Sequence, residues 1–220
     1  MSARRLSRMR AALDRRQPDL RVLLDGVHKS HNLSAILRTC DAVGIGRVHA
    51  VWPGDRLAVH RNCSAGAGRW VELDVHRRVE EAVAAARAEG LAVYAAHASA
   101  QAMDFRSVDW TRPGALLMGA ELWGVSEAGA ELADAHLAVP MLGLTESLNV
   151  SVAAAVVLYE AQRQRQAAGF YERPRLDPQA YRRTLFRWLQ PRLARYCDAR
   201  GLDYPELDAD GHVSGWSPVG

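Results

Sequence analysis

Short apolar runs, separated by helical patterns and bounded by glycine or proline, restrict the possible folds of this chain most strongly. Five runs have strand length and are apolar almost throughout, as strands buried on both faces are: residues 21–27, 47–52, 91–97, 115–120 and 135–141. Helical spacing relates Leu33, Ile36, Leu37, Cys40 and Val43. It also relates Val79, Ala82, Val83 and Ala86, which precede Gly90, a residue suited to end a helix. This alternation predicts an α/β fold with a parallel sheet.

The two ends of the chain differ from its middle. Residues 1–17 are rich in arginine, and the sequence from residue 163 onward is arginine-rich, aromatic and helical in pattern. We therefore predict a basic N-terminal arm (1–17), a central domain (18–162) and a C-terminal helical extension (163–220). Basic charge gathered at two flanks is typical of a nucleic-acid footprint, although a solvated helix face is the ordinary explanation for either flank alone.

Composition supports an anionic partner and a reducing environment. Lys29 is the only lysine among the 28 basic residues, so arginine, which suits bidentate phosphate recognition, supplies the rest. A genome that favours arginine codons explains the same bias. The cysteines, Cys40, Cys63 and Cys197, include no C-x-x-C pair, which argues against a disulfide framework or a zinc site. No apolar stretch is long enough to span a membrane, and we expect a soluble, cytoplasmic protein.

The common phosphate-binding loops are missing. The stretch "GIGRVH" begins like G-x-G-x-x-G but has His49 in place of the third glycine, and no P-loop motif occurs. His28 and His31 are three residues apart, yet no carboxylate or thiol completes a plausible metal site around them. A nucleotide-dependent oxidoreductase or hydrolase is therefore disfavoured, and we expect no metal.

Polar residues instead gather after three of the apolar runs. In residues 28–44, Asn32 is placed to cap a helix, with Arg38 on the side opposite its apolar face. In residues 118–129, Glu121 directly follows a strand, the usual position of a ligand-binding turn in an open α/β sheet. In residues 141–161, polar side chains stand where an apolar helix begins: Ser147, Asn149 and Ser151. Such a cluster is either an N-cap or the floor of a binding site.

Taken together, the stretches "NLSAILRT", "LLMGAELWG" and "VPMLGLTESLNVSVAAAVVLYEA" resemble the three signature motifs of the SPOUT superfamily of RNA 2′-O-ribose methyltransferases. Further stretches, "RRQPDL", "VHKSHN", "DAVGIGRVHAVWPG", "DFRSVDWTRPGALLMG" and "LYEAQRQR", resemble the tRNA guanosine-18 methyltransferases of the TrmH type. The resemblance is dense over residues 4–172. It implies a parallel sheet with a deep C-terminal trefoil knot, basic helical extensions at both termini, and a homodimer paired through the knot region.

The same resemblance implies S-adenosylmethionine-dependent methylation of a ribose 2′-hydroxyl in tRNA, at guanosine 18 of the D-loop. It assigns the chemistry to Arg38, supported by Asn32, Glu121, Ser147 and Asn149. It assigns cofactor binding to the surroundings of Ala96, Gly119, Val139, Met141 and Leu148. The alternatives are a ribosomal RNA 2′-O-methyltransferase of the same superfamily and a non-catalytic RNA-binding relative, which would lose the reactive set.

Overall fold

In the computed structural model, residues 3–52 and 67–213 are described. Their contacts divide the chain into two compact units. Gln17–Phe170 form one, the sheet unit, and the segments up to Arg16 and from Tyr171 onward form the other, the helical unit. The boundary expected between residues 162 and 163 falls inside a helix, α6 (Val150–Ala167).

The sheet unit is built on parallel strands, which confirms the predicted α/β class. The strands are β1 (Leu20–Asp25), β2 (Arg47–Val51), β3 (Glu72–His76), β4 (Ala92–Ala96), β5 (Met103–Asp104), β6 (Gly114–Met118) and β7 (Ala135–Ala138). Their order is β3-β2-β1-β6-β4-β7-β5, and every pair is parallel. All residues of the neighbouring strands β1 and β6 are buried, which explains why both are apolar runs in the sequence.

The sequence reading missed two strands. β3 alternates polar and apolar residues because it lies at one edge of the sheet, and β5, at the other edge, has only two residues. All five predicted runs also extend past the carboxyl ends of their strands. The strand expected to reach residue 120 ends at Met118, and the strand expected to reach residue 141 ends at Ala138.

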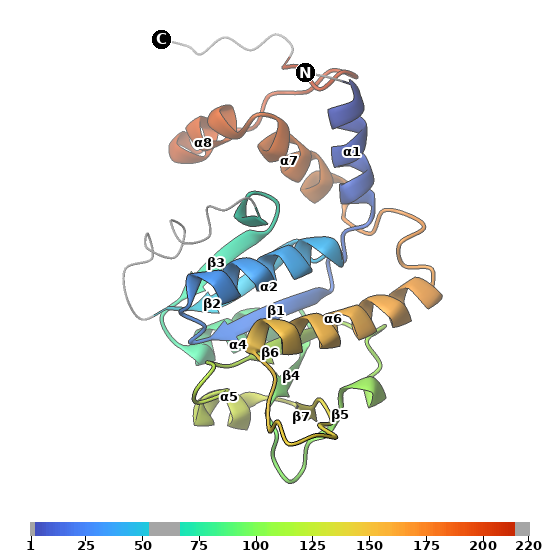
Figure 1. Ribbon diagram of the computed structural model, residues 1–220. Coiled ribbons are helices and arrows are strands. Elements are labelled where there is room, and N and C mark those ends of the chain that lie inside the picture. The colour runs from blue at the N-terminus through green and yellow to red at the C-terminus, as the bar shows by residue number, and fades with distance from the viewer. Residues whose placement is uncertain (1–2, 53–66, 214–220) are drawn as a thin grey trace. The chain divides into compact units, whose positions relative to one another are not determined.

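Helices cover both faces of the sheet, as Figure 1 shows. On one face α2 (Ser30–Ala42) packs against α6, and the predicted apolar side of α2, Leu33, Ile36, Leu37, Cys40 and Val43, belongs to the larger core cluster. On the other face α4 (Val79–Ala88) packs against α5 (Glu127–Leu132) over a second cluster. Gly90 follows α4 with a φ of 76°, which confirms it as the glycine that ends this helix. Among the described residues, the unit also contains two short 3-10 turns, η1 (Ala67–Arg69) and η2 (Phe105–Ser107).

A buried arginine joins the first segment of the sheet unit to its last helix, α6. Arg165, on α6, is 0% exposed, and its Nη1 donates to Asp19 Oδ1 over 2.6 Å. Its Nε donates to the carbonyl of Trp110 over 2.7 Å, and its Nη2 reaches the carbonyl of Arg112 over 3.2 Å. Arg165 belongs to the basic segment that begins at residue 163, but its donors are used inside the core.

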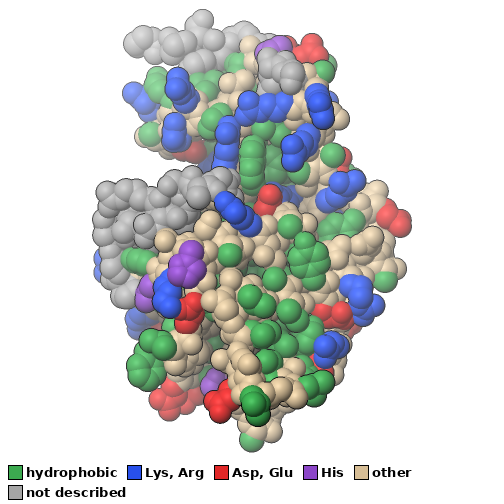
Figure 2. All heavy atoms as spheres, in the orientation of Figure 1, with side chains coloured by type: hydrophobic (Ala, Val, Ile, Leu, Met, Phe, Trp, Pro, Cys, Tyr) green, Lys and Arg blue, Asp and Glu red, His purple; other side chains and the backbone are tan. Residues whose placement is uncertain are grey.

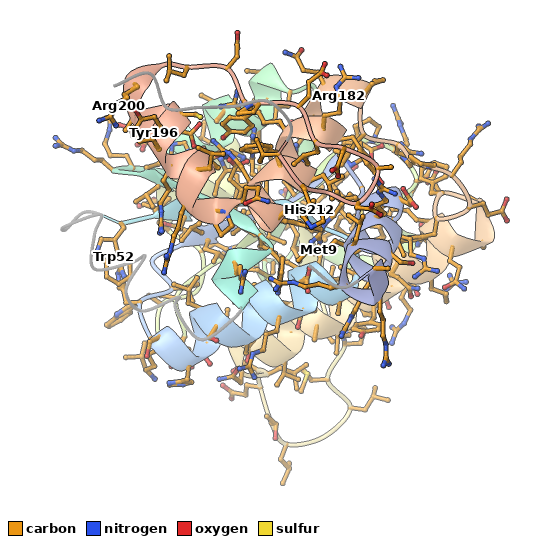
Figure 3. All side chains as sticks on the ribbon, turned by 90° about the horizontal axis from the view of Figure 1, so that it is seen from above. Met9, Trp52, Arg182, Tyr196, Arg200 and His212 are labelled. Atoms are coloured by element: carbon orange, nitrogen blue, oxygen red, sulfur yellow. The ribbon has the colours of Figure 1, made fainter. Side chains whose placement is uncertain are left out.

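The helical unit contains α1 (Ala3–Asp14), α7 (Pro178–Leu189) and α8 (Pro191–Arg200). α1 packs on α7 through buried apolar residues, and the Tyr181 hydroxyl donates to Asp14 Oδ1 over 2.9 Å. Arginines cover the outside of these helices: Arg4, Arg5, Arg8, Arg10, Arg182, Arg183, Arg192, Arg195 and Arg200 are exposed. In Figure 3, Arg182 and Arg200 extend away from their helices, and Arg200 lies over the ring of Tyr196, 4.0 Å from its centroid.

None of the helices within residues 3–52 and 67–213 has the length and apolar content needed to cross a bilayer. Cys40 and Cys197 are buried, and Cys63 lies outside the described residues.

Candidate functional site

The candidate site lies at the carboxyl ends of adjacent central strands. β1 pairs with β6, and β6 pairs with β4, which in turn pairs with β7. α2 follows β1, the turn that carries Glu121 follows β6, and the segment leading to α6 follows β7. Because the carboxyl ends of parallel strands meet at one edge of a sheet, three segments that are distant in sequence converge there.

Glu121 is the centre of a hydrogen-bonded cluster at this edge. Its Oε1 accepts from the side-chain amides of both Asn32 and Asn149, the latter over 2.9 Å. Asn149 Nδ2 also lies 3.3 Å from Asn32 Oδ1. The other carboxylate oxygen of Glu121, Oε2, forms an ion pair with Lys29. The structure thus brings three residues singled out from the sequence together and adds Lys29.

Asn149 and Asn32 have different structural roles. Asn149 is the N-cap of α6, because its Oδ1 accepts from the backbone N–H of Ser151 over 2.9 Å. Asn149 therefore caps α6 and takes part in the cluster at the same time. The prediction that Asn32 caps α2 is wrong: Lys29 occupies the N-cap position, and Asn32 lies in the first turn. Asn32 is only 2% exposed, and its amide is turned toward Glu121 rather than toward its own helix end.

The cluster keeps Glu121 ionised. The ion pair with Lys29, followed by the hydrogen bond from Asn32, lowers the pKa of the Glu121 carboxyl below its ordinary value. Both of its oxygens already accept hydrogen bonds. A carboxylate that is bound on both oxygens and holds its proton weakly is a poor general base at neutral pH. Glu121 is instead arranged to orient Lys29 and the side-chain amides of Asn32 and Asn149.

A tight turn holds Glu121 in this position. Ala120 and Gly124 exchange two backbone hydrogen bonds of 2.8 Å each, and Gly124 has a φ of 68°. A Cβ on Gly119 would lie 1.9 Å from the carbonyl carbon of Gly124, so no other residue fits there without opening the turn.

Asp25 anchors the far side of this turn and was not singled out from the sequence. Its Oδ2 accepts from the backbone N–H of Ser126 over 2.8 Å, and Ser126 in turn caps α5 by accepting from Gly129 N. The signal available in the sequence is a charged residue that ends the apolar run "RVLLDG".

Arg38 and Ser147, the two remaining residues assigned to the chemistry, are both exposed. Arg38 is exposed on α2, on the side opposite the buried Leu33, Ile36 and Leu37, which confirms its predicted placement on the helix. Ser147 is exposed in the segment before α6, and no hydrogen bond joins it to Glu121 among the described residues. A direct role for Ser147 stays a prediction.

Three of the five residues expected to bind the cofactor lie at the same edge of the sheet. Ala96 ends β4 opposite Leu137 of β7, Gly119 follows β6, and Val139 follows β7. Because β4 lies between β6 and β7, these three backbone segments are neighbours. Met141 and Leu148 are half-buried, whereas the residues between them are exposed, with Leu142 at 101% and Leu144 at 103%.

A histidine fixes the turn after β4. The Ser99 hydroxyl lies 2.8 Å from His136 Nδ1, and His136 Nε2 lies 3.0 Å from the carbonyl of Ala130. This arrangement fits a His136 that donates from Nε2 and accepts from Ser99 at Nδ1. It ties the turn to β7 and to α5. Among the described residues, no group of three or more histidine, cysteine, aspartate or glutamate side chains is placed to hold a metal ion.

Comparison with known proteins gives consistent results. Residues 19–159 match the family described as "SpoU rRNA Methylase family", and residues 163–215 match "SpoU, rRNA methylase, C-terminal". A curated tRNA (guanosine(18)-2′-O)-methyltransferase of Escherichia coli (strain K12) is 46% identical, over 97% of this chain and 94% of its own.

Solved structures agree. The A. aeolicus TrmH/SpoU tRNA modifying enzyme is 39% identical, with a TM-score of 0.77 over 84% of this chain and 94% of its own. An AdoMet-bound rRNA methyltransferase from Sinorhizobium meliloti is 29% identical, with a TM-score of 0.60 over 70% of this chain and 59% of its own. The first family match alone spans more than half of the sequence. The chain therefore belongs to the SpoU methylase family, within the SPOUT superfamily, and is of the TrmH type.

Proposed function

We propose that this chain transfers the methyl group of S-adenosylmethionine to the ribose 2′-hydroxyl of guanosine 18 in tRNA. The observation that carries the proposal is the cluster in which Glu121, after β6, holds Lys29 and Asn32 of the segment after β1 and Asn149 of the segment after β7. A non-catalytic relative has no need of such a cluster. The relative that matches 97% of this chain is named for this reaction.

The residues at the sheet edge fit S-adenosylmethionine. Adenosine needs apolar walls and backbone hydrogen-bonding groups, and the ends of β4, β6 and β7 supply both, with Ala96 and Val139 packed against the core. Gly119 has no side chain, so it leaves the backbone of its turn uncovered at this position. When bound, the cofactor supplies a methyl group on a sulfonium. We assign Ala96, Gly119, Val139, Met141 and Leu148 to its binding.

Arg38 is assigned the task of stabilising the reacting 2′-oxygen. The hydroxyl must lose its proton as it attacks, and Glu121 is a poor acceptor because both of its oxygens are occupied. Keeping an arginine neutral at pH 7 costs on the order of 7–9 kcal/mol, because its free pKa is about 12.5–13.8. A charged Arg38 that positions the hydroxyl and stabilises the developing alkoxide avoids this cost. Ser147 is assigned a supporting contact in the same site.

The C-terminal half of the sheet unit is proposed to form the trefoil knot. β7 enters the sheet between β4 and β5, two strands that precede it in the chain, and the segment after β7 leads into α6, which packs on α2. Threading of this kind is a rare exception to the rule that chains do not pass through their own loops.

A second copy of the chain is proposed to cover the outer face of α6. Val152, Val156 and Tyr159 are 47%, 36% and 53% exposed and recur at helical spacing. Figure 2 shows hydrophobic side chains gathered over this helix. Leu142 and Leu144, in the segment just before α6, are fully exposed in the single chain. A homodimer that buries these residues accounts for them, since exposed apolar patches mark interaction surfaces.

The helical unit is proposed to bind tRNA phosphates through its exposed arginines. They lie on α1, α7 and α8, whose apolar sides pack inward, so the charge faces solvent. We retain the three predicted parts as a proposal: the flanks, 1–17 and 163–220, bind RNA, and the central part, 18–162, carries out catalysis. A tRNA substrate also supports the proposal of a cytoplasmic protein.

The direct test is to map methylated riboses after purified protein and S-adenosylmethionine are incubated with tRNA and, separately, with ribosomal RNA. The expected result is a single 2′-O-methylguanosine at position 18 of tRNA. Methylation confined to ribosomal RNA favours the ribosomal alternative, and methylation of neither RNA leaves the non-catalytic one.

A further inference from the structure

The ion pair between Lys29 and Glu121 is asymmetric in exposure. The side chain of Lys29 is 59% exposed, whereas that of Glu121 is 18% exposed. Oε1 of Glu121 is occupied by the amides of Asn32 and Asn149, and the ammonium occupies Oε2. The carboxylate is therefore covered by its partners, and the lysine is the one that extends from the cluster into solvent.

The residue type at position 29 is also exceptional for this chain. Only one of the 28 basic residues is a lysine, and it lies in the catalytic cluster. A bias toward arginine codons acts on every position alike, so it does not explain why this position keeps lysine. Arginine presents a flat fork of donors, whereas an ammonium presents three donors around a compact charge. One donor serves Glu121, and two remain for an acceptor on the solvent side.

The charges at the site favour an anionic acceptor. Lys29 neutralises Glu121, the two asparagine amides are uncharged, and Arg38 adds a positive charge on the exposed side of α2. An RNA backbone brings a phosphate next to every ribose. A lysine ammonium binds such a phosphate as a point charge.

We propose that Lys29 contacts the substrate directly: its ammonium, held by Glu121, binds a non-bridging oxygen of the phosphate next to the target ribose. The inference rests on the proposed function. It divides two tasks between two cations, because Lys29 holds the phosphate and Arg38 is left to act on the 2′-oxygen. Glu121 is then a positioning residue, which fixes Lys29 through one oxygen and is itself fixed by Asn32 and Asn149 through the other.

The first test compares Lys29→Met, Lys29→Arg and the control Arg87→Met. Arg87 is also an exposed cation paired with a carboxylate, Asp134, but it lies at the end of α4 that precedes β4, at the opposite edge of the sheet. We expect Lys29→Met to weaken tRNA binding and to reduce the slope of log affinity against log salt by about 1, with cofactor affinity unchanged. Arg87→Met leaves the slope at the wild-type value.

Lys29→Arg keeps the charge and changes its shape. We expect it to retain the salt slope and to lower the single-turnover rate about 10-fold, because a fork that grips Glu121 and the phosphate displaces the ribose. An unchanged salt slope in Lys29→Met overturns the proposal.

The second test uses the uniqueness of Lys29. Reductive methylation with carbon-13-labelled formaldehyde marks only Lys29 and the terminal amine and preserves both charges, and Lys29→Arg assigns the two NMR signals. We expect the Lys29 signal to shift when tRNA is added. A Lys29 signal that stays in place at saturating tRNA, in a protein that still methylates guanosine 18, refutes the lysine contact alone. Absence of methylation by the unmodified protein refutes the proposed function instead.

Discussion

Arg165 and Asp19 are 146 positions apart in the sequence, yet Arg165 Nη1 lies 2.6 Å from Asp19 Oδ1 inside the sheet unit. The pair joins the segment that enters the unit to the helix that leaves it. Four further acceptors, on Gln17, Asp19, Trp110 and Arg112, receive hydrogen bonds from the same guanidinium. A fully buried cation is tolerated because nearly every donor has a partner.

Replacing Arg165 is therefore expected to destabilise the protein rather than to weaken RNA binding. Arg165→Met removes one partner of a buried ion pair, a change that costs about 3–5 kcal/mol. Arg163→Met is the matched control, because Arg163 is 68% exposed and its pair with Glu160 is worth about 1 kcal/mol or less. Thermal unfolding of the two variants checks the difference. Equal melting temperatures would show that the buried network contributes nothing.

Gly119→Ala is expected to open the turn that holds Glu121. The new Cβ has no room beside Gly124 and Val125, so the turn must move and the cluster around Glu121 must come apart. We expect methyl transfer to fall by about 100-fold, the size of effect that follows loss of a positioned group.

Gly90→Ala is the control for backbone strain. Gly90 has a φ of 76° but nothing within 4 Å of an added Cβ, so this variant loses about 1–2 kcal/mol of stability and keeps its activity per folded molecule. The rate is measured beside a melting curve for each variant. Full activity in folded Gly119→Ala would contradict the account of the turn.

Glu160 gives the protein a defined sensitivity to acid. The Arg163 guanidinium holds the pKa of the Glu160 carboxyl at about 2, below its ordinary value of 4.5. A lowered pKa in the folded state stabilises the protein above pH 4.5, and the contribution is lost as the pH falls toward 2. Wild type should exceed Glu160→Gln in stability at pH 6, and the difference should shrink as acid is added. Urea unfolding at several pH values tests this, with the exposed Glu131→Gln as control; a difference independent of pH would refute it.

The dimer proposal is tested on α6. Val156→Asp places a charge in the middle of the exposed apolar stripe, and we expect it to dissociate the protein. Ala84→Asp adds the same charge to an exposed position on α4 and should leave the dimer intact. Sedimentation should give twice the chain mass of 24.2 kDa for wild type and the control. Sedimentation of the wild-type protein as a monomer at micromolar concentration would contradict the homodimer.

The sequence was sufficient for the elements that local pattern determines. Buried strands such as β1 and β6 have continuous apolar residues at their centres, and the core face of α2 follows from helical spacing. The edge strand β3 was missed because Glu72, Asp74 and His76 alternate with its apolar residues, which breaks the run. β5 is too short to leave any pattern.

Family motifs were enough to single out candidate residues of the site. The sequence did not predict the contacts of a side chain whose partner is distant in the chain. Asn32 was expected to cap its own helix, but its amide is bound by Glu121, 89 positions away. Lys29 was visible only as an isolated lysine among arginines. Arg165 looked like one more basic residue of an RNA-binding flank, because the acceptors that bury it come from two other segments of the chain.

The proposed action of Arg38 on the target ribose is measured by single-turnover methyl transfer to tRNA, with Arg38→Ala at saturating cofactor. Arg38 lies opposite the buried side of α2, so the variant should keep its melting transition and its cofactor affinity. We predict that the rate at guanosine 18 falls about 100-fold or more, and that Arg38→Lys does not restore it. A near-normal rate in Arg38→Ala, or a rate loss that matches an equal loss of the melting transition, would contradict the account.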